Sequence, residues 1–412
     1  MPSFFGAIDW FLAYGNAEQG FFRDHSALYD AITLPGTVAT FFRQGAGGFV
    51  LALKKPYIID PRTSIFQSAF DRGRLGTRHM KLAEMHGPTL TEIIKGRALL
   101  ESDLQHGLLD EMARSVVAFQ RTYVQTSADK LDEYRRRLGE DAQEPLHAYL
   151  TLPPYFRFDR AHGPWHEASV SMATTAIRCE HLGPVCPVVC LSERCLASGD
   201  FDAIVRTYDH EGFGGYFVWV SKWDQYRTSP ANLRAFAEMV RSFRATGRPV
   251  INLFGGYFSA MLVHLGLAGL SHGVGYGEAR DAFYYRGGPP SQRYYVPMLH
   301  RFYPRSDAER LLDLLGGLAE RCDCPACVRV SEEQDTPATQ AGRLDRQGLL
   351  SHFLYVRRKE LEHVARTPLD TLISELQSTY DSIAHSLPQT RAPLVVPRIQ
   401  HLSRWVEALT GL

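Results

Sequence analysis

Three cysteines lie within six residues, at Cys322, Cys324 and Cys327, with Pro325 favouring a turn between the last two. Thiolates are preferred zinc ligands, and three of them can share one ion only if the chain folds tightly around it. Zinc requires a fourth ligand, and His352 follows after a predicted loop, early in a predicted helix. Four protein ligands leave no open position, so the spacing predicts a structural zinc site. The alternative is three free, buried cysteines.

Two aspartates end short segments that have the composition of strands. Asp60 ends PYIID, and Asp159 ends PYFRFD. Carboxylates at the carboxyl ends of barrel strands are well placed for proton transfer or for binding a polar ligand. Each also has a purely structural interpretation. An Asp before Pro61 is often a turn residue, and Asp159 could pair with Arg157 or Arg160 at the surface.

These residues lie where predicted strands alternate with predicted helices. The strand candidates are PYFRFD, PVCPVVCLS, GGYFVWVS, RPVINLFGG and AGLSHGVGYG, and helices are expected near 165–179, 198–208, 229–246 and in GYFSAMLVHLGLA. This alternation predicts a parallel sheet with right-handed crossovers. With short strands expected in residues 30–60, the units predict an α/β fold, a (β/α)8 TIM-type barrel. An open doubly wound sheet is disfavoured because no G-x-G-x-x-G opens a helix after a strand.

The expected organisation is a barrel over 1–320, with a charged, amphipathic helical insert at about 76–146. A zinc-binding subdomain and C-terminal helices are expected over 321–412. The polar stretch 331–346 is predicted to be the most mobile part.

Composition restricts the class of protein. Hydrophobic residues make up 45% of the 412 residues, and Lys+Arg and Asp+Glu are both 45, so a globular chain without a wholly basic surface is expected. No apolar run reaches the roughly 18 residues of a membrane span, and the N-terminus lacks the basic region of a signal peptide. Seven unevenly placed cysteines favour a reducing, cytoplasmic location.

The C-x-C-x-x-C segment with a helical His about 25 residues later resembles the zinc site of tRNA-guanine transglycosylases. In that family the His opens an H-N-L-type motif, and here the residues are His352, Phe353 and Leu354. The resemblance implies a (β/α)8 barrel with a zinc subdomain inserted near its C-terminal end, in agreement with the strand and helix pattern.

The resemblance also implies roles for the strand-end residues. Asp60, with Phe66 and Gln67 downstream, is similar to the D-S-G-G-[YF]-Q motif, whose Asp is the general acid and base. Asp159 resembles the Asp of the F-D-E motif, which binds the guanine-like base. A carboxylate suits that task because it accepts from both the N–H and the amino group of a guanine edge. Gly214 and Gly215, before Tyr216, are similar to the strand whose backbone touches the base.

The family nucleophile is an Asp in a G-[VI]-D-x-F-D motif, and that position falls at about Gly273 here. A neighbouring carboxylate could replace it. Asp224 and Glu278 rank equally as candidates, with Asp281 behind them, and a catalytically inactive relative is the alternative. Ser271 and His272 would point to opposite faces of a strand, which disfavours a serine hydrolase.

Arginines and tyrosines alternate through residues 275–305, and a second basic stretch covers 71–81. Arg with Tyr on a Gly/Pro-rich loop suits phosphate contacts and stacking on unpaired bases. A solvated surface with tyrosines packed inside is the alternative.

Because the catalytic motifs are degenerate, the divergent DpdA-type branch, which inserts 7-cyano-7-deazaguanine into DNA, is the closest resemblance. It implies a pentosyltransferase that exchanges guanine for a 7-deazaguanine base, with DNA favoured over tRNA as partner and with accessory modification proteins or a homodimer possible. The alternatives are a tRNA-guanine transglycosylase acting on tRNA and a non-catalytic, zinc-containing nucleic-acid-binding subunit.

Overall fold

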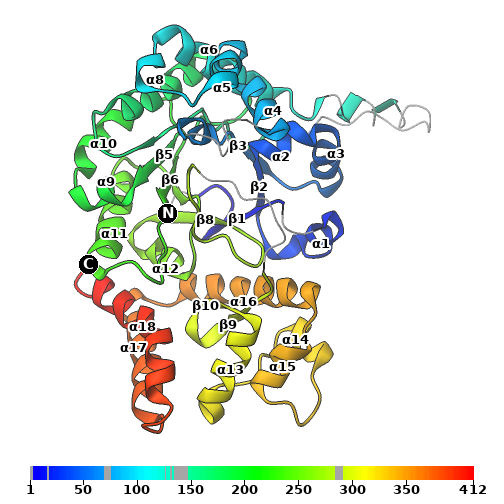
Figure 1. The fold of residues 1–412 in the computed structure, drawn as a ribbon, viewed down its shortest axis with the longest axis vertical. Coiled ribbons are helices and arrows are strands. Elements are labelled where there is room, and N and C mark those ends of the chain that lie inside the picture. Colours follow the sequence, from blue (N-terminus) through cyan, green and yellow to red (C-terminus); the bar gives the residue numbers. More distant parts are fainter. Residues whose placement is uncertain are drawn as a thin grey trace.

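Eight short strands form one parallel sheet (Figure 1). The computed structural model describes residues 3–15, 18–68, 76–125, 127–129, 132–133, 147–283 and 291–412. The strands are β1 (Asp9–Ala13), β2 (Ala31–Pro35), β3 (Tyr57–Asp60), β4 (Arg157–Phe158), β5 (Val188–Ser192), β6 (Tyr216–Ser221), β7 (Val250–Asn252) and β8 (Leu267–Gly273). Nearly every strand residue is buried, as expected for a parallel sheet covered on both faces.

The strand order is β3-β2-β1-β8-β7-β6-β5-β4, so the first and last strands of this sheet, β1 and β8, are neighbours near its middle. This is the order of a (β/α)8 barrel cut between β3 and β4. At that cut, Ile58 of β3 forms a parallel bridge with Leu150, and Thr151 forms one with Val185. The predicted α/β class is therefore confirmed, and the sheet is a curled half-barrel.

The concave side of the curl is filled by side chains from widely separated strands. Phe11, Ile58, Cys190, Trp219 and Ile251 belong to one buried cluster, although they come from β1, β3, β5, β6 and β7. Side chains two residues apart share a face of a strand. Asp60, two residues after Ile58, therefore follows this interior column at the carboxyl edge of the sheet.

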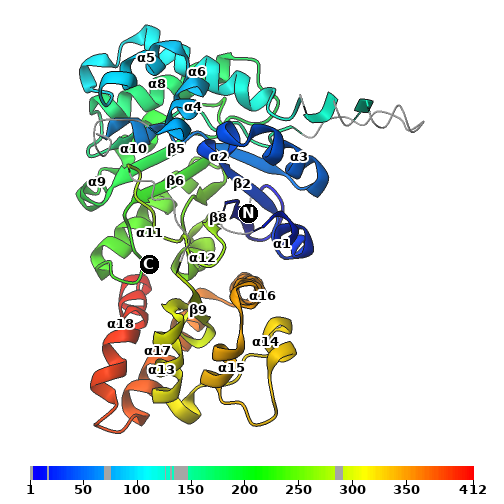
Figure 2. The same ribbon diagram turned by 45° about the vertical axis from the view of Figure 1, so that its right-hand side comes forward.

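Helices cover the convex side of the sheet (Figures 1 and 2). They are α1 (Gln19–Asp24), α2 (Gly36–Phe41), α3 (Arg43–Leu53), α4 (Thr77–His86), α5 (Pro88–Gly96), α6 (His106–Arg121), α8 (Pro164–Arg178), α9 (Glu193–Ser198), α10 (Phe201–Tyr208), α11 (Pro230–Arg244) and α12 (Tyr257–Met261). The expectation of only short strands in 30–60 is wrong for 36–53. The apolar positions there are spaced for a helix, and tertiary packing outweighs the cost of several glycines.

The C-terminal elements lie below the sheet in both views. They are β9 (Arg293–Val296), β10 (Arg301–Pro304), α13 (Arg305–Leu315), α14 (Pro325–Val330), α15 (Pro337–Arg343), α16 (Arg346–Arg366), α17 (Leu369–Ser386) and α18 (Ala392–Leu409). The β9–β10 hairpin and α13 pack with α15 and α16. Within 331–346, the stretch predicted to be mobile, Thr336 caps α15 by accepting from the Thr339 N–H at 3.2 Å.

None of the helices formed by the described residues has both the length and the hydropathy needed to cross a bilayer.

Candidate metal centre and the carboxyl edge of the sheet

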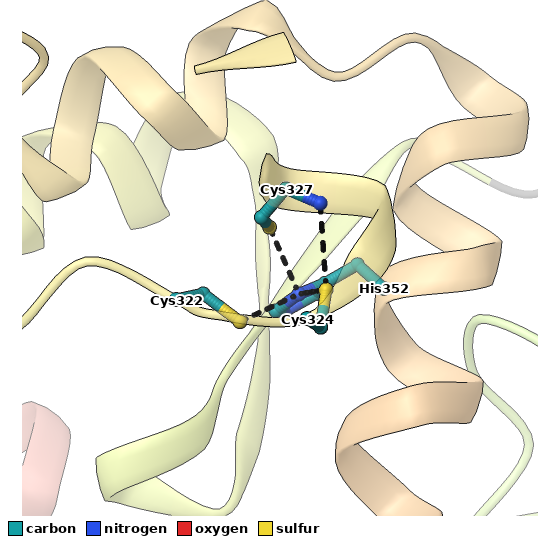
Figure 3. Close-up of side chains that lie close together, drawn as sticks. All are labelled: Cys322, Cys324, Cys327 and His352. Atoms are coloured by element: carbon teal, nitrogen blue, oxygen red, sulfur yellow. Dashed lines mark hydrogen bonds between the residues drawn. The ribbon is translucent and has the colours of Figure 1, made fainter. Parts of the chain in front are cut away.

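The four predicted ligands come together where the start of α14 meets α16 (Figure 3). Cys324 is the N-cap of α14, Pro325 occupies its first turn, and the Cys324 Sγ accepts from the Cys327 N–H at 3.4 Å. Cys322 lies in the extended segment before the cap, and His352 projects from the second turn of α16. The predicted set of ligands is therefore assembled by two helix starts.

The distances between these side chains match a tetrahedral metal site. The His352 Nδ1 lies 3.5 Å from the Sγ atoms of Cys322 and Cys324 and 3.3 Å from that of Cys327. All four ligand atoms lie within 4.8 Å of one another. Zn–S bonds of about 2.3 Å and a Zn–N bond of about 2.0 Å at tetrahedral angles place S and N about 3.5 Å apart. The cluster could hold a metal ion such as zinc.

The other nitrogen of His352 fixes the orientation of the ring. His352 Nε2 lies 2.7 Å from the carbonyl oxygen of Tyr295, an acceptor, so Nε2 carries the proton. The Nδ1 lone pair then faces the sulfur atoms, as a metal ligand requires. The Tyr294 ring stacks on the imidazole, with 4.4 Å between centroids and an interplanar angle of 10°.

A glutamine holds the loop that carries the first cysteine. Gln340 of α15 accepts from the Cys322 N–H at 2.7 Å and donates to the Cys322 carbonyl at 3.0 Å. The contacts with the Cys322 and Cys327 thiols lower the pKa of the Cys324 thiol, since sulfur atoms this close favour a thiolate. Three cysteines and one histidine, with Cys324, Cys327 and His352 fully buried, form a closed ligand set.

At the carboxyl edge of the sheet, Asp60 is buried and firmly held. Its Oδ1 accepts from the Tyr155 hydroxyl at 2.6 Å and from the Arg62 N–H at 3.1 Å. Burial, and then the Asp60 carboxylate, raise the pKa of Tyr155 well above its usual value, so the phenol keeps the proton it donates. This carboxylate is thus preorganised inside the curl rather than placed as a surface turn residue.

Arg62 follows Asp60 into the interior and is strained there. Its backbone is left-handed, with φ of 54°, and its side chain is 2% exposed. The guanidinium lies over the Trp219 ring, 5.5 Å from the centroid, and its Nε lies 3.9 Å from the Asp60 Oδ2. Neither Nη1 nor Nη2 has a hydrogen-bond partner within the part of the chain that the structure describes.

Residues 274–283, the edge loop, fold back over this edge of the sheet. Ser221 at the end of β6 accepts from the Ala282 N–H at 3.0 Å, and Ser64 donates to the Ala282 carbonyl at 3.0 Å. The Arg280 carbonyl accepts from the Trp219 indole at 3.3 Å. The buried Ala282 packs in the same cluster as Trp219, so the loop is part of the interior.

Asp281 of the edge loop lies at the same edge of the sheet as Asp60. Its Oδ1 accepts from the Phe283 N–H at 3.0 Å and from the Ser221 hydroxyl at 3.4 Å, and its Oδ2 lies 3.3 Å from the Lys222 Nζ. Asp60 ends β3 and Asp281 lies beside the end of β6, so both carboxylates are at the carboxyl edge.

Asp159 follows β4 and is paired at the surface. Its side chain is 56% exposed, and both carboxylate oxygens accept from Arg157 at 2.8 Å. The Arg157 guanidinium in turn lies over the Phe283 ring of the edge loop, 4.3 Å from its centroid. The ion pair between Asp159 and Arg157, which was the alternative interpretation of the sequence, is therefore present.

Gln67 binds backbone within the protein. Its Oε1 accepts from the Arg157 N–H at 2.7 Å, and its Nε2 donates to the Arg157 carbonyl at 2.9 Å. Both ends of the amide are therefore occupied in tying the segment after β3 to β4, across the cut in the sheet.

Gly214 and Gly215 lie at the opposite edge, before the first residue of β6. A Cβ on Gly214 would lie 2.4 Å from the Pro184 side chain, and one on Gly215 would lie 3.0 Å from Phe4. Glycine is required there by close packing, and the structure separates both residues from Asp60.

Glu278 is a buried residue of the edge loop, with both carboxylate oxygens occupied. Its Oε1 accepts from the Arg357 Nη2 at 2.6 Å, and its Oε2 accepts from the Gln225 Nε2 at 3.0 Å and from the Tyr226 hydroxyl. Burial raises the pKa of Glu278 to about 7, although the Arg357 charge opposes this. The carboxylate connects the edge loop to α16.

Asp224 acts as a turn residue. Its Oδ1 accepts from the Tyr226 N–H at 2.9 Å, and its Oδ2 lies 3.6 Å from the Arg227 Nε. Its charge acts on Glu193 of α9 and Arg404 of α18, and also on Tyr276 and Glu278 of the edge loop.

Three tyrosines of the expected nucleic-acid surface are core residues. Tyr294, Tyr295 and Tyr303 are each 5% exposed or less, because 293–304 forms the β9–β10 hairpin against α16. Because these three tyrosines are buried, the prediction that they stack on unpaired bases is wrong for them. Tyr284, Tyr285 and Arg286 in the same segment, and residues 71–75 of the second basic stretch, lie outside the described residues.

The sequence interpretation missed Arg62, Tyr155 and Trp219. A signal for Tyr155 was present, since Tyr155, Arg157 and Asp159 alternate along PYFRFD and share a face in an extended chain.

Comparisons with protein-family models and with curated proteins find no match to this chain.

Proposed function

We propose that the protein is a base-exchange transglycosylase that replaces guanine by a 7-deazaguanine, 7-cyano-7-deazaguanine in particular, in nucleic acid, with DNA as the favoured substrate. The observation that carries the proposal is the buried Cys322, Cys324, Cys327 and His352 cluster, attached to a parallel α/β sheet. The same combination is what the resemblance to tRNA-guanine transglycosylases implies. Zinc at this cluster and full closure of the sheet into a (β/α)8 barrel are parts of the same proposal.

The chemistry requires two groups at the sugar. A carboxylate forms a bond to C1′ as the bond from C1′ to the guanine nitrogen breaks, and an acid gives that nitrogen a proton. The incoming base then loses its N9 proton to the same group and bonds to C1′, which releases the carboxylate.

Asp60 is assigned the acid and base role, because it is buried, hydrogen-bonded to Tyr155 and adjacent to the interior. Among the three candidates for the nucleophile, position favours Asp281. Glu278 is tied to Arg357, and Asp224 holds a turn by accepting from the Tyr226 N–H, whereas Asp281 lies beside Ser221 at the carboxyl edge, where β3 also ends in Asp60. This reverses the order expected from sequence.

The test is exchange of labelled guanine into DNA and, separately, into tRNA, followed by trapping of a covalent adduct. The proposal is supported if the wild type incorporates label into DNA, Asp60→Ala does not, and the exposed-site control Asp24→Ala does. If label enters tRNA alone, the substrate is tRNA rather than DNA. No adduct with either nucleic acid overturns the enzyme proposal in favour of a binding subunit.

A further inference from the structure

We infer that Arg62 recognises the base, donating from Nη1 and Nη2 to O6 and to the acceptor at position 7. The inference rests on the proposed function and deepens it, because it names the part of the base that the protein inspects. In 7-cyano-7-deazaguanine the position-7 acceptor is the nitrile nitrogen, and in guanine it is N7.

The first support is that these donors are unused. The Arg62 side chain is 2% exposed, and both Nη groups lack a hydrogen-bond partner among the described residues. Buried donors are nearly always paired, and an unpaired charged group is costly. A left-handed φ of 54° at a non-glycine residue adds strain, which concentrates at ligand sites. The position of this side chain is therefore explained by a ligand.

The second support is the form of the donor. A guanidinium presents two parallel N–H groups to two adjacent acceptors, and Arg binds the O6 and N7 edge of guanine in this way. Trp219 holds the plane from one side, 5.5 Å from the Arg62 Cζ, so the orientation of the fork is set before a ligand binds.

Charge favours a neutral base over phosphate as the ligand. The Asp60 carboxylate lies 3.9 Å from the Arg62 Nε. Like charges at this range in a buried setting repel, so a phosphate bound to Arg62 would be opposed by the Asp60 carboxylate. An uncharged purine with two acceptors uses the free Nη groups without that repulsion.

Access requires movement of the edge loop, because Ala282 packs in one cluster with Trp219, whose ring lies against the Arg62 guanidinium. Near Ala282 the loop is held by hydrogen bonds with the Ser64 and Ser221 hydroxyls, which water can replace. Elsewhere the loop is anchored by the ion pairs of Glu278 with Arg357 and of Asp281 with Lys222.

The experiment is calorimetric titration of the full-length, metal-loaded protein with 7-cyano-7-deazaguanine, with 7-deazaguanine, which lacks the nitrile, and with inorganic phosphate. We expect the wild type to bind the cyano base at least tenfold more tightly than 7-deazaguanine. In Arg62→Met that preference should disappear, and Arg62→Lys, which keeps the charge but not the fork, should retain little of it. Arg23→Met, 74% exposed, is the matched control. Thermal melting checks that each variant is folded.

If folded Arg62→Met is still active in exchange and still prefers the cyano base over 7-deazaguanine as strongly as the wild type, the inference is overturned and the proposed function stands. Phosphate that competes with the base in the wild type, and no longer binds Arg62→Met, overturns it in favour of an anion site. If the wild type binds neither base and forms no adduct, the inference and the proposed function both fail.

Discussion

The His352 Nε2 donates to the carbonyl oxygen of Tyr295 at 2.7 Å, and this single hydrogen bond aims Nδ1 at the three sulfur atoms. The helix that carries His352 also carries Arg357, whose Nη2 lies 2.6 Å from the Glu278 Oε1. One rigid helix therefore contacts both the metal cluster and the edge loop.

We predict one zinc ion per chain, measured by elemental analysis of purified protein. Cys327→Ser should lose the ion and lower the free energy of unfolding by on the order of 3 kcal/mol or more, because binding energy at a closed zinc site is largely folding energy. Cys179→Ser is the control, since this thiol lies outside the cluster and bonds the Thr175 carbonyl. Wild-type protein without stoichiometric zinc contradicts the prediction.

The stability of the protein should depend on pH through Glu278. Its folded pKa of about 7 lies above the ordinary value of 4.5, so between these values the folded state binds more protons than the unfolded state. The stabilisation is complete below about pH 4.5 and is lost as the pH rises through 7. From pH 5.5 to 7.5 this loss amounts to about 2 kcal/mol.

Urea unfolding of the wild type and Glu278→Gln at both pH values measures this contribution. The difference in stability, variant minus wild type, should increase by about 2 kcal/mol from pH 5.5 to 7.5. The comparison cancels the pH dependence of metal binding, which both proteins share. A difference that stays constant with pH shows that Glu278 is ionised throughout.

Of the candidate nucleophiles, only Asp281 should be required for a covalent adduct with DNA. Asp281→Ala should abolish trapping, with a loss of at least about a thousandfold, because the nucleophile itself is removed. Asp224→Ala should retain exchange within a factor of about three, because that carboxylate holds a turn. Trapping that survives in Asp281→Ala places the nucleophile elsewhere.

Gln67→Met should lower the free energy of unfolding by about 1–3 kcal/mol, since it leaves the N–H and carbonyl of Arg157 without their partner. Gln19→Met, at an exposed position, is the control. Chemical denaturation gives both values. Equal stabilities would mean that water replaces the glutamine at β4.

The sequence by itself determined the metal ligands and the class of fold. Three of the four ligands lie within six residues, and the fourth is early in a strongly patterned helix, so local geometry nearly suffices to bring them together. The alternation of apolar segments with amphipathic helices likewise predicted the parallel sheet, because hydrophobic periodicity is a local property. Asp60 was found at a strand end for the same reason.

Tertiary structure alone decided what each strand-end residue is free to do. Glu278 is occupied by Arg357, 79 residues away, and Gln67 is occupied by Arg157, 90 residues away. Among the described residues the two Nη groups of Arg62 have no hydrogen-bond partner, and Trp219 from another strand lies against its guanidinium. Whether a polar atom is free or paired depends on partners distant in the chain, and residue type and spacing carry no information about them.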